Sequence, residues 1–178
     1  GIGHDVGSVC SAMLSMKDDD SIRWVFVGGG VMRPVLEAFI AEHGIRNVVM
    51  RPYQPRERLG SLIALGDVHL VLVADGFSGL LIPSKFYGVM AAARPTIYVG
   101  PAGSEVARVV EERKCGFVVG NGDADGLVSA IRELKRDPVA ALAMGIRGRR
   151  ALESDYSMQR ACGQWRDLLG RVCADASA

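Results

Sequence analysis

Short apolar runs alternate with amphipathic segments along most of the chain, and this alternation constrains the fold more than any single motif. The short runs are typical of buried strands, and the segments between them have the spacing of helices. Strands that are joined through helices pair in parallel, because the crossover returns the chain in the same direction. The expected strands are Arg23–Gly28, Asn47–Arg51, Val68–Val73, the residues after Pro95, and Cys115–Val119.

The sequence therefore predicts an α/β fold, a Rossmann-like parallel sheet with helices on both faces. The whole chain, residues 1–178, is expected to form a single domain, with a C-terminal helix within residues 153–178. Gly1-Ile2-Gly3-His4-Asp5 is typical of the end of a strand and the loop that leads into a helix. We therefore expect one more strand just before Gly1, and a longer polypeptide of which this chain is a C-terminal fragment.

Composition excludes several classes of protein. The chain is 49% hydrophobic and 23% charged, which is typical of a soluble globular domain. Its net charge is +1, so no global field attracts a nucleic acid, and no nucleic-acid partner is expected. No apolar run approaches the roughly 18 residues that a membrane-spanning helix needs. The four cysteines and three histidines lack the spacing of metal ligands, so no metal site is predicted.

Residues 67–100 carry the clearest sign of a ligand site. A buried strand is followed by a loop with Gly76 and Gly79, and then by Ser84 and Lys85 at the start of a helix of small residues. Free backbone N–H groups and the helix dipole favour anions at such a helix start. Lys85 is the strongest single candidate for a phosphate contact, and the alternative is a solvated lysine on a helix.

A second glycine-rich turn, Gly28-Gly29-Gly30, follows the first expected strand. It is not a dinucleotide fingerprint, because that pattern needs a glycine where this chain has Arg33. The glycines are explained equally by a tight turn between strand and helix or by close approach of the backbone to a ligand. Arg33 is a candidate phosphate contact or a surface side chain.

Other motifs have structural explanations. Asp5, Ser104 and Asp123 each precede a helical pattern and are expected N-caps. No serine lies in a nucleophile elbow. The expected last two helices are Pro138–Leu152 and Ser157–Val172; the second carries an apolar stripe, for which packing in the core is favoured over a partner surface. The stripe consists of Trp165, Leu168, Leu169 and Val172.

Four segments, taken in order, resemble the carboxyl-terminal domain of the retaining glycosyltransferases of family 4, which have the GT-B fold. The resemblance covers nearly the whole chain and is strongest to the bacterial surface-polysaccharide branch of the WcaI/WbuB type. The segments are VFVGGG, NVVMRPYQP, GLLIPSKFYGVMAAARPTI and GSEVARVVEERKCGFVVGNGDADGL.

The resemblance implies one half of a GT-B fold that binds a nucleotide-sugar donor. Residues expected at the donor diphosphate are Gly28, Gly29, Gly30, Ser84 and Lys85. Those expected at the base and ribose are Arg51, Tyr53, Gln54 and Gly88. Those expected at the donor sugar are Gly76, Phe77, Ser78, Gly79 and Glu105.

One position departs from the family pattern. Members of the family commonly carry two glutamates, of which the second binds the ribose, and alignment puts Gly88 at that second position. The first position is not a glutamate either. This departure leaves open a second function, a non-catalytic α/β nucleotide-binding or interaction module that has lost donor binding. A related GT-B-like enzyme, such as a nucleotide-sugar epimerase, is a third and weaker alternative.

The function implied by the resemblance is transfer of a sugar from a UDP- or GDP-sugar co-substrate to an acceptor in bacterial surface polysaccharide synthesis. No cofactor or metal is expected, and the catalytic residues are not assigned. The implied acceptor is a lipid-linked saccharide held by an N-terminal acceptor domain outside this chain. The expected location is the cytoplasm, with peripheral attachment to the inner face of the cell membrane. This chain alone is expected to be inactive.

Overall fold

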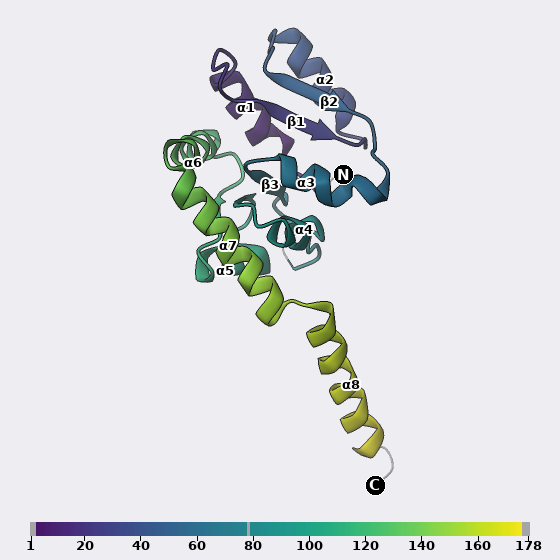
Figure 1. The fold of residues 1–178 in the computed structure, drawn as a ribbon. Coiled ribbons are helices and arrows are strands. Elements are labelled where there is room, and N and C mark those ends of the chain that lie inside the picture. The colour runs from purple at the N-terminus through teal and green to yellow at the C-terminus, as the bar shows by residue number, and fades with distance from the viewer. Residues whose placement is uncertain (1–2, 78, 176–178) are drawn as a thin grey trace.

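The computed structural model describes residues 3–77 and 79–175. Strands and helices alternate in it as the sequence predicts (Figure 1). In chain order the elements are α1 (Val6–Ser15), β1 (Trp24–Val27), α2 (Arg33–Glu42), β2 (Val48–Arg51), the 3-10 helix η1 (Arg56–Arg58), α3 (Leu59–Leu65), β3 (His69–Leu72), α4 (Lys85–Ala91), β4 (Thr96–Val99), α5 (Glu105–Glu112), β5 (Gly116–Val119), α6 (Ala124–Arg136), α7 (Pro138–Asp155) and α8 (Met158–Asp175).

All strand pairs among the described residues are parallel, as predicted, but the hydrogen-bonded ladder is not continuous. β1 pairs with β2, and β3, β4 and β5 pair in that order. No ladder joins β1 to β3 among these residues. The single sheet expected from the sequence is therefore divided into a pair of strands and a group of three (Figure 1).

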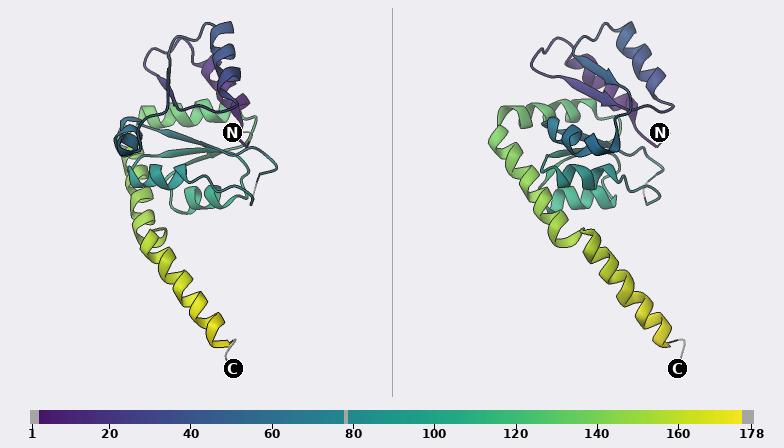
Figure 2. Two further views of the ribbon diagram at one scale, coloured as in Figure 1. Left: turned by 90° about the vertical axis from the view of Figure 1, so that its right-hand side faces the viewer. Right: turned by 45° about the vertical axis from the view of Figure 1, so that its right-hand side comes forward.

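Helices cover both faces of the three-stranded sheet. Because successive side chains of a strand point to opposite faces, Ile97 and Val99 of β4 enter one core cluster and Tyr98 enters another. The first cluster lies under α1, α2 and α6, and the second under α4, α5 and α7. Figure 2 shows α6 on one side of β3–β5 with α4 and α5 on the other. Every residue of β4 is buried, as expected for the central strand of a covered sheet.

The expected helix caps at three helix starts are confirmed. Side-chain oxygens of Asp5, Ser104 and Asp123 accept hydrogen bonds from backbone N–H groups in the first turns of α1, α5 and α6. Residues 56–65 begin as the 3-10 turn η1 and continue as α3. There Arg58 N–H donates to the Pro55 carbonyl oxygen, a bond three residues long that tightens the first turn.

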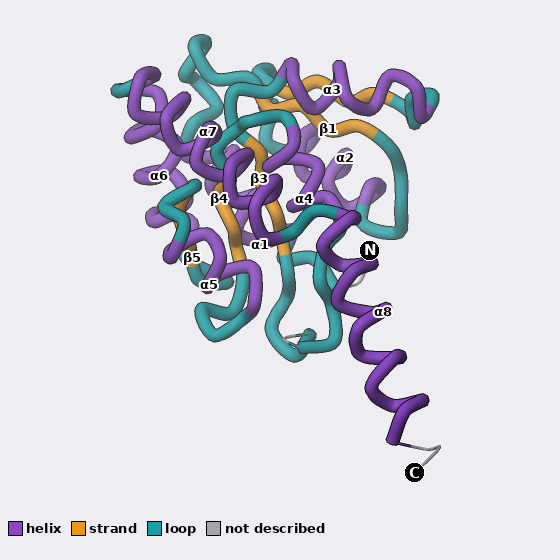
Figure 3. Tube along the Cα trace, turned by 60° about the horizontal axis from the view of Figure 1, so that its bottom comes forward, coloured by secondary structure: helices purple, strands orange, loops and turns teal. Residues whose placement is uncertain are grey.

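The C-terminal segment, residues 153–178, contains the last turn of α7 and all of α8. The chain turns at Tyr156, and α8 then extends away from the domain (Figures 1 and 3). The expectation that the apolar stripe of this helix packs in the core is wrong for the described residues, because Trp165 is 64% exposed and the other stripe residues are also exposed. Those residues are Leu168, Leu169 and Val172.

Candidate functional site

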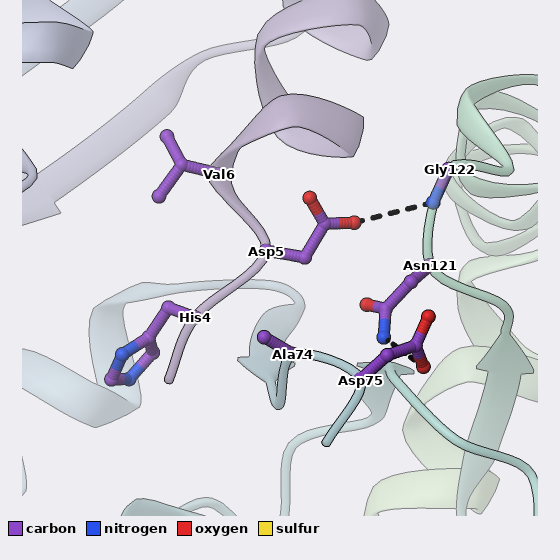
Figure 4. A pocket seen from close by; sticks show the side chains of 7 residues that line it. All are labelled: His4, Asp5, Val6, Ala74, Asp75, Asn121 and Gly122. Atoms are coloured by element: carbon purple, nitrogen blue, oxygen red, sulfur yellow. Dashed lines mark hydrogen bonds between the residues drawn. The ribbon is translucent and has the colours of Figure 1, made fainter. Parts of the chain in front are cut away.

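A pocket of about 470 Å³ lies where the carboxyl ends of β3 and β5 meet the loop before α1 (Figure 4). Open parallel sheets bind ligands at this edge, because loops and helix starts converge there. Polar side chains predominate in the lining. The lining residues are His4, Asp5, Val6, Ala74, Asp75, Asn121 and Gly122.

Asp5 connects the start of α1 to the turn after β5. Its carboxylate accepts hydrogen bonds from the Ser8 amide and the Gly122 amide, each at 3.3 Å, and from the Ser8 hydroxyl. The Ser8 hydroxyl oxygen in turn accepts from the Gly122 amide at 2.8 Å. Desolvation acts to raise the pKa of Asp5, but these hydrogen bonds outweigh it and lower the pKa below 3.8. Asp5 is therefore held as a carboxylate at neutral pH.

Asn121 fixes the opposite wall of the pocket. Its Nδ2 donates to the Asp75 carboxylate at 2.7 Å and to the Val73 carbonyl oxygen at 3.1 Å. Its Oδ1 is buried and has no hydrogen-bond partner among the described residues. Figure 4 shows Asp75 and Asn121 together on one side of the pocket and the His4 ring pointing away from Asp5. The pocket thus contains acceptor oxygens whose positions are set by the loops.

The glycine turn after β1 lies against the side chain of Tyr53. Gly28 and Gly30 have φ angles of +110° and +130°, where any residue with a Cβ is strained. A Cβ added to Gly28 or Gly29 would lie 3.1 or 3.2 Å from the Tyr53 ring. The ring therefore rests on this backbone, yet Tyr53 is 76% exposed. This geometry fits both explanations suggested by the sequence, a tight turn between strand and helix and close approach of the backbone to a ligand.

Arg33 joins the ends of β1 and β2. Its guanidinium donates to the carbonyl oxygens of Gly28 and Arg51, the latter at 3.1 Å, and pairs with Glu37 at 2.7 Å. These bonds give Arg33 a structural role in this conformation. The exposed Gln54 lies in the loop after Arg51, and its Nε2 donates to the Pro52 carbonyl oxygen at 3.1 Å.

The loop after β3 carries the residues expected at the donor sugar. Gly76 and Gly79 have φ angles of +85° and +75°, so both positions favour glycine. Phe77 packs close to Gly3, because a Cβ on Gly3 would lie 3.4 Å from its ring. Ser78, also expected at the sugar, lies outside the described residues.

The ammonium of Lys85 lies at the free edge of β3. The residue as a whole is exposed, but Nζ donates to the Leu70 carbonyl oxygen at 2.7 Å. Desolvation of the ammonium lowers the pKa of Lys85 below its usual value. Ser84, the exposed N-cap residue of α4, forms no side-chain capping bond. A phosphate contact by Lys85 would require the lysine to leave the Leu70 carbonyl.

The last two residues that the resemblance places at the donor, Gly88 and Glu105, lie on helices. A Cβ on Gly88 would lie 3.2 Å from Ile63 Cδ1, so Gly88 lies where α4 packs on α3. Glu105 opens α5 and pairs with Arg108 at 2.6 Å. The expected contacts of both residues with a donor stay predictions.

The lining of the pocket includes none of the residues expected to bind the donor. The sequence indicates Asp5 only as a helix cap, Asn121 only as part of a turn, and His4 only as a loop residue. A common signal is present, since each lies in a loop that follows an expected strand. Such loops meet at one edge of a parallel sheet even when they are more than a hundred residues apart.

The charge of Asp5 is expected to make stability depend on pH. The pKa of Asp5 is lower in the folded protein than in the unfolded chain. The carboxylate therefore adds to the free energy of unfolding above pH 3.8, and this stabilisation is lost as the pH falls through the folded pKa. Asp5→Asn keeps a good N-cap but removes the charge, and should cost at most about 1 kcal/mol at pH 7, since Asp5 is partly exposed. Urea unfolding at pH 7 and pH 3 measures the free energy of unfolding of the wild type and of Asp5→Asn.

The difference in the free energy of unfolding between the wild type and Asp5→Asn should be smaller at pH 3 than at pH 7. Asp20→Asn, in the exposed turn after α1, is the matched control and should follow the wild type at both pH values. If Asp5→Asn lowered the free energy of unfolding by the same amount at pH 7 and pH 3, the carboxylate would not be the stabilising form of Asp5.

Two kinds of structural feature are absent from the part of the chain that the structure describes. Residues 3–77 and 79–175 contain no cluster of three His, Cys, Asp or Glu side chains arranged to hold a metal ion. None of the helices in these ranges combines the length and apolar character needed to cross a membrane.

Comparison with known proteins identifies a family and several relatives. The model of the family described as "Glycosyl transferases group 1" matches residues 6–137. The putative colanic acid biosynthesis glycosyl transferase WcaI of Escherichia coli is 28% identical over 93 residues, which are 52% of this chain and 23% of that protein. The probable glycosyltransferase WbjE of Pseudomonas aeruginosa is 26% identical over 152 residues, which are 85% of this chain and 37% of that protein. The chain thus spans well under half the length of these relatives.

Solved structures share the fold at low identity. Sucrose-phosphate synthase from Thermosynechococcus elongatus has a TM-score of 0.81 at 20% identity, over 98% of this chain and 44% of that one. A mutant of S. aureus TarM, in complex with fondaparinux, alpha-GlcNAc-glycerol and UDP, has a TM-score of 0.77 at 18% identity, over 93% of this chain and 33% of that one. The α/β fold with a parallel sheet and flanking helices is therefore confirmed.

Proposed function

The chain belongs to the group 1 family of glycosyl transferases, and on this premise we propose that it is the domain that binds the nucleotide-sugar donor. The observation that carries the proposal is the arrangement at the carboxyl ends of β1 and β2. There the positive-φ turn at Gly28 and Gly30 exposes backbone next to the open face of the Tyr53 ring. An aromatic face suits a nucleotide base, and the backbone N–H groups of Gly29 and Gly30 suit a diphosphate, whereas the Gly28 N–H already donates to the Arg51 carbonyl oxygen at 3.1 Å.

In this proposal the expected donor residues keep the roles that the family resemblance gives them. The glycine turn, with Ser84 and Lys85, binds the diphosphate, while Arg51, Tyr53 and Gln54 line the base. The loop at Gly76–Gly79 and Glu105 approach the sugar. The ribose is the weakest part of the proposal, because Gly88 replaces the family's glutamate and packs against Ile63.

The chemistry needed from this domain is electrostatic. In the transfer, the bond between the anomeric carbon and the donor diphosphate breaks, and a bond from the same carbon to the acceptor hydroxyl oxygen forms on the same face of the sugar. The hydroxyl proton passes to the departing diphosphate. Negative charge develops on the departing diphosphate. Lys85 and backbone N–H groups at the glycine turn stabilise that charge, so the reaction does not need a protein nucleophile.

The finer assignment is to bacterial surface polysaccharide synthesis, in the WcaI/WbuB branch. It is supported by the names of the relatives, since WcaI is described as a colanic acid biosynthesis enzyme. We further propose a UDP- or GDP-sugar donor, a lipid-linked saccharide acceptor, and a place in the cytoplasm at the inner face of the membrane. Because the chain spans 23% to 37% of these two relatives, the acceptor is assigned to polypeptide outside residues 1–178.

Mapping of a nucleotide on the protein tests this proposal. Titration of ¹⁵N-labelled protein with UDP, and separately with GDP, should shift the amide resonances of Gly28–Gly30, Tyr53 and Gln54. The amide of Gly170 on the projecting helix α8 serves as the internal reference and should not move. Shifts confined to α8, or none at saturating nucleotide, would contradict the proposed site.

One observation favours the second candidate function, a non-catalytic module without donor binding. Gly88 lacks the carboxylate that the family resemblance implies at this position, and a Cβ there would lie 3.2 Å from Ile63 Cδ1. The two functions give opposite results in the titration, because a module that has lost donor binding does not respond to either nucleotide.

A further inference from the structure

Helix α7 packs along α4 and reaches the turn that ends α5 (Figure 1). α4 ends at Ala91 and α5 at Glu112, and each is followed by a residue in the left-handed region, Ala93 at a φ of +52° and Lys114 at a φ of +50°. Neither residue is a glycine, so each is held in this conformation by its surroundings. α7 supplies part of those surroundings at both places.

Two arginines of α7 bond to the carboxyl ends of these helices. Arg149 Nη1 donates to the Ala91 carbonyl oxygen at 2.5 Å, and Arg147 Nε donates to the Lys114 carbonyl oxygen at 2.7 Å. Glu153 accepts from Arg149 Nε at 2.6 Å, which fixes the direction of the guanidinium. A carbonyl in the last turn of a helix has no N–H partner within that helix, so Arg149 satisfies a group that α4 itself leaves unpaired.

The two helices differ at their amino ends. Ser104 caps α5, since its hydroxyl oxygen accepts a hydrogen bond from the Ala107 amide at 3.1 Å. Ser84 forms no such bond at the start of α4. Lys85 bonds there to the Leu70 carbonyl oxygen at 2.7 Å, and the proposed phosphate contact would break that bond. α5 is therefore fixed by side chains at both ends, whereas α4 with a bound donor depends on the side chain at its carboxyl end.

The bond from Arg149 adds something that apolar packing does not. Phe86 and Met90 bury one face of α4 in the core cluster that also contains Ala151 of α7. The stabilisation from such burial is proportional to area and is not directional. A charge-assisted hydrogen bond has a defined length and angle, so it sets one fixed point at the end of the helix.

We propose that Arg149 is a positioning residue for the donor site, which fixes the carboxyl end of α4 and thereby sets where Lys85 meets the donor diphosphate. This inference rests on the proposed function, because it needs Lys85 as a donor contact. Arg149 does not itself touch the donor. It acts from the end of α4 that lies away from the carboxyl ends of the strands.

Calorimetric titration of three variants with UDP and GDP tests this role. Arg149→Met should fold, because the side chain is 49% exposed, and should weaken binding. We expect a loss of roughly tenfold, since removing a side chain that orients a binding group costs about 10- to 100-fold in affinity at metal sites. Arg149→Lys keeps a donor for the Ala91 carbonyl and should restore most of the affinity. Arg147→Met is the matched control, because it loses the same kind of bond at the end of α5 and should bind as the wild type does.

A double-mutant cycle shows whether Arg149 acts through Lys85. In the Lys85→Met background, Arg149→Met should cause no further loss of affinity, because the group that it positions is already absent. A merely structural role would weaken binding by the same factor in both backgrounds. Equal losses in both backgrounds, or equal losses for Arg149→Met and Arg147→Met, would overturn the proposal.

Hydrogen exchange without nucleotide separates this inference from the proposed function. Arg149→Met should speed exchange of the Met90 and Ala92 amides of α4 on the order of tenfold, whereas Arg147→Met should leave them unchanged. Unchanged exchange in Arg149→Met would overturn the positioning role even if the wild type binds a nucleotide. A wild type that binds neither nucleotide would contradict the proposed function, while faster exchange in Arg149→Met would still support the hold of Arg149 on α4.

Discussion

Replacing Gly145 with alanine is expected to lower the free energy of unfolding by about 3 kcal/mol. Gly145 lies on α7 at its crossing with the end of α4, where an added Cβ would lie 2.0 Å from the carbonyl oxygen of Ala93 and 2.5 Å from its carbonyl carbon. Both are backbone atoms and cannot rotate away. Ala93 is itself held at a φ of +52° by the turn that ends α4, so the two helices must separate to admit a methyl group.

The matched control is Gly170→Ala on the projecting helix α8. No atom lies within 4 Å of a Cβ built there, so alanine should be neutral or should stabilise by up to about 1 kcal/mol through its higher helix propensity. Urea unfolding followed by circular dichroism gives both values. Equal effects at positions 145 and 170 would contradict the close packing of α7 on α4.

Replacing Lys85 with methionine is expected to weaken nucleotide binding about tenfold. A charge-assisted hydrogen bond to a phosphate contributes about 1.5–3 kcal/mol, and part of this is lost because the lysine must first leave the Leu70 carbonyl. Methionine keeps the length and the apolar stem of the side chain. The effect should therefore appear in the dissociation constant for a nucleoside diphosphate, measured by calorimetry.

Lys17→Met is the control for this experiment. Lys17 lies in the exposed turn after α1, so its replacement removes the same charge without touching the carboxyl ends of the strands. Its affinity for the nucleotide should equal that of the wild type. Equal losses for Lys17→Met and Lys85→Met would indicate a general effect of net charge, and would remove Lys85 from the site.

Much of the fold follows from local patterns in the sequence. The buried run around Val71 and the fully buried run Thr96–Val99 predict adjacent parallel strands, and the caps at Asp5, Ser104 and Asp123 predict where helices begin. These features depend on neighbouring residues, so spacing and residue type are enough to find them. The glycine turn after β1 is predictable for the same reason.

Features that depend on contacts between distant segments do not follow from the sequence pattern. The pocket brings Asp5 and Gly122 together across 117 residues, and nothing in either local sequence indicates that pairing. The bond from Lys85 to Leu70 depends on an interrupted sheet, which a pattern of strands and helices does not reveal. The exposure of the stripe at Trp165 is not predictable either, because periodicity predicts an apolar face but not what covers it.

Calorimetric titration of the protein with UDP, GDP and ADP tests the central claim most directly, since each nucleotide supplies the same diphosphate and a different base. A donor-binding domain should bind UDP or GDP at least about tenfold more tightly than ADP, a difference of roughly 1.4 kcal/mol. Equal affinity for all three would indicate an anion site without base recognition. Absence of binding to any of them would contradict the assignment of this domain to the donor.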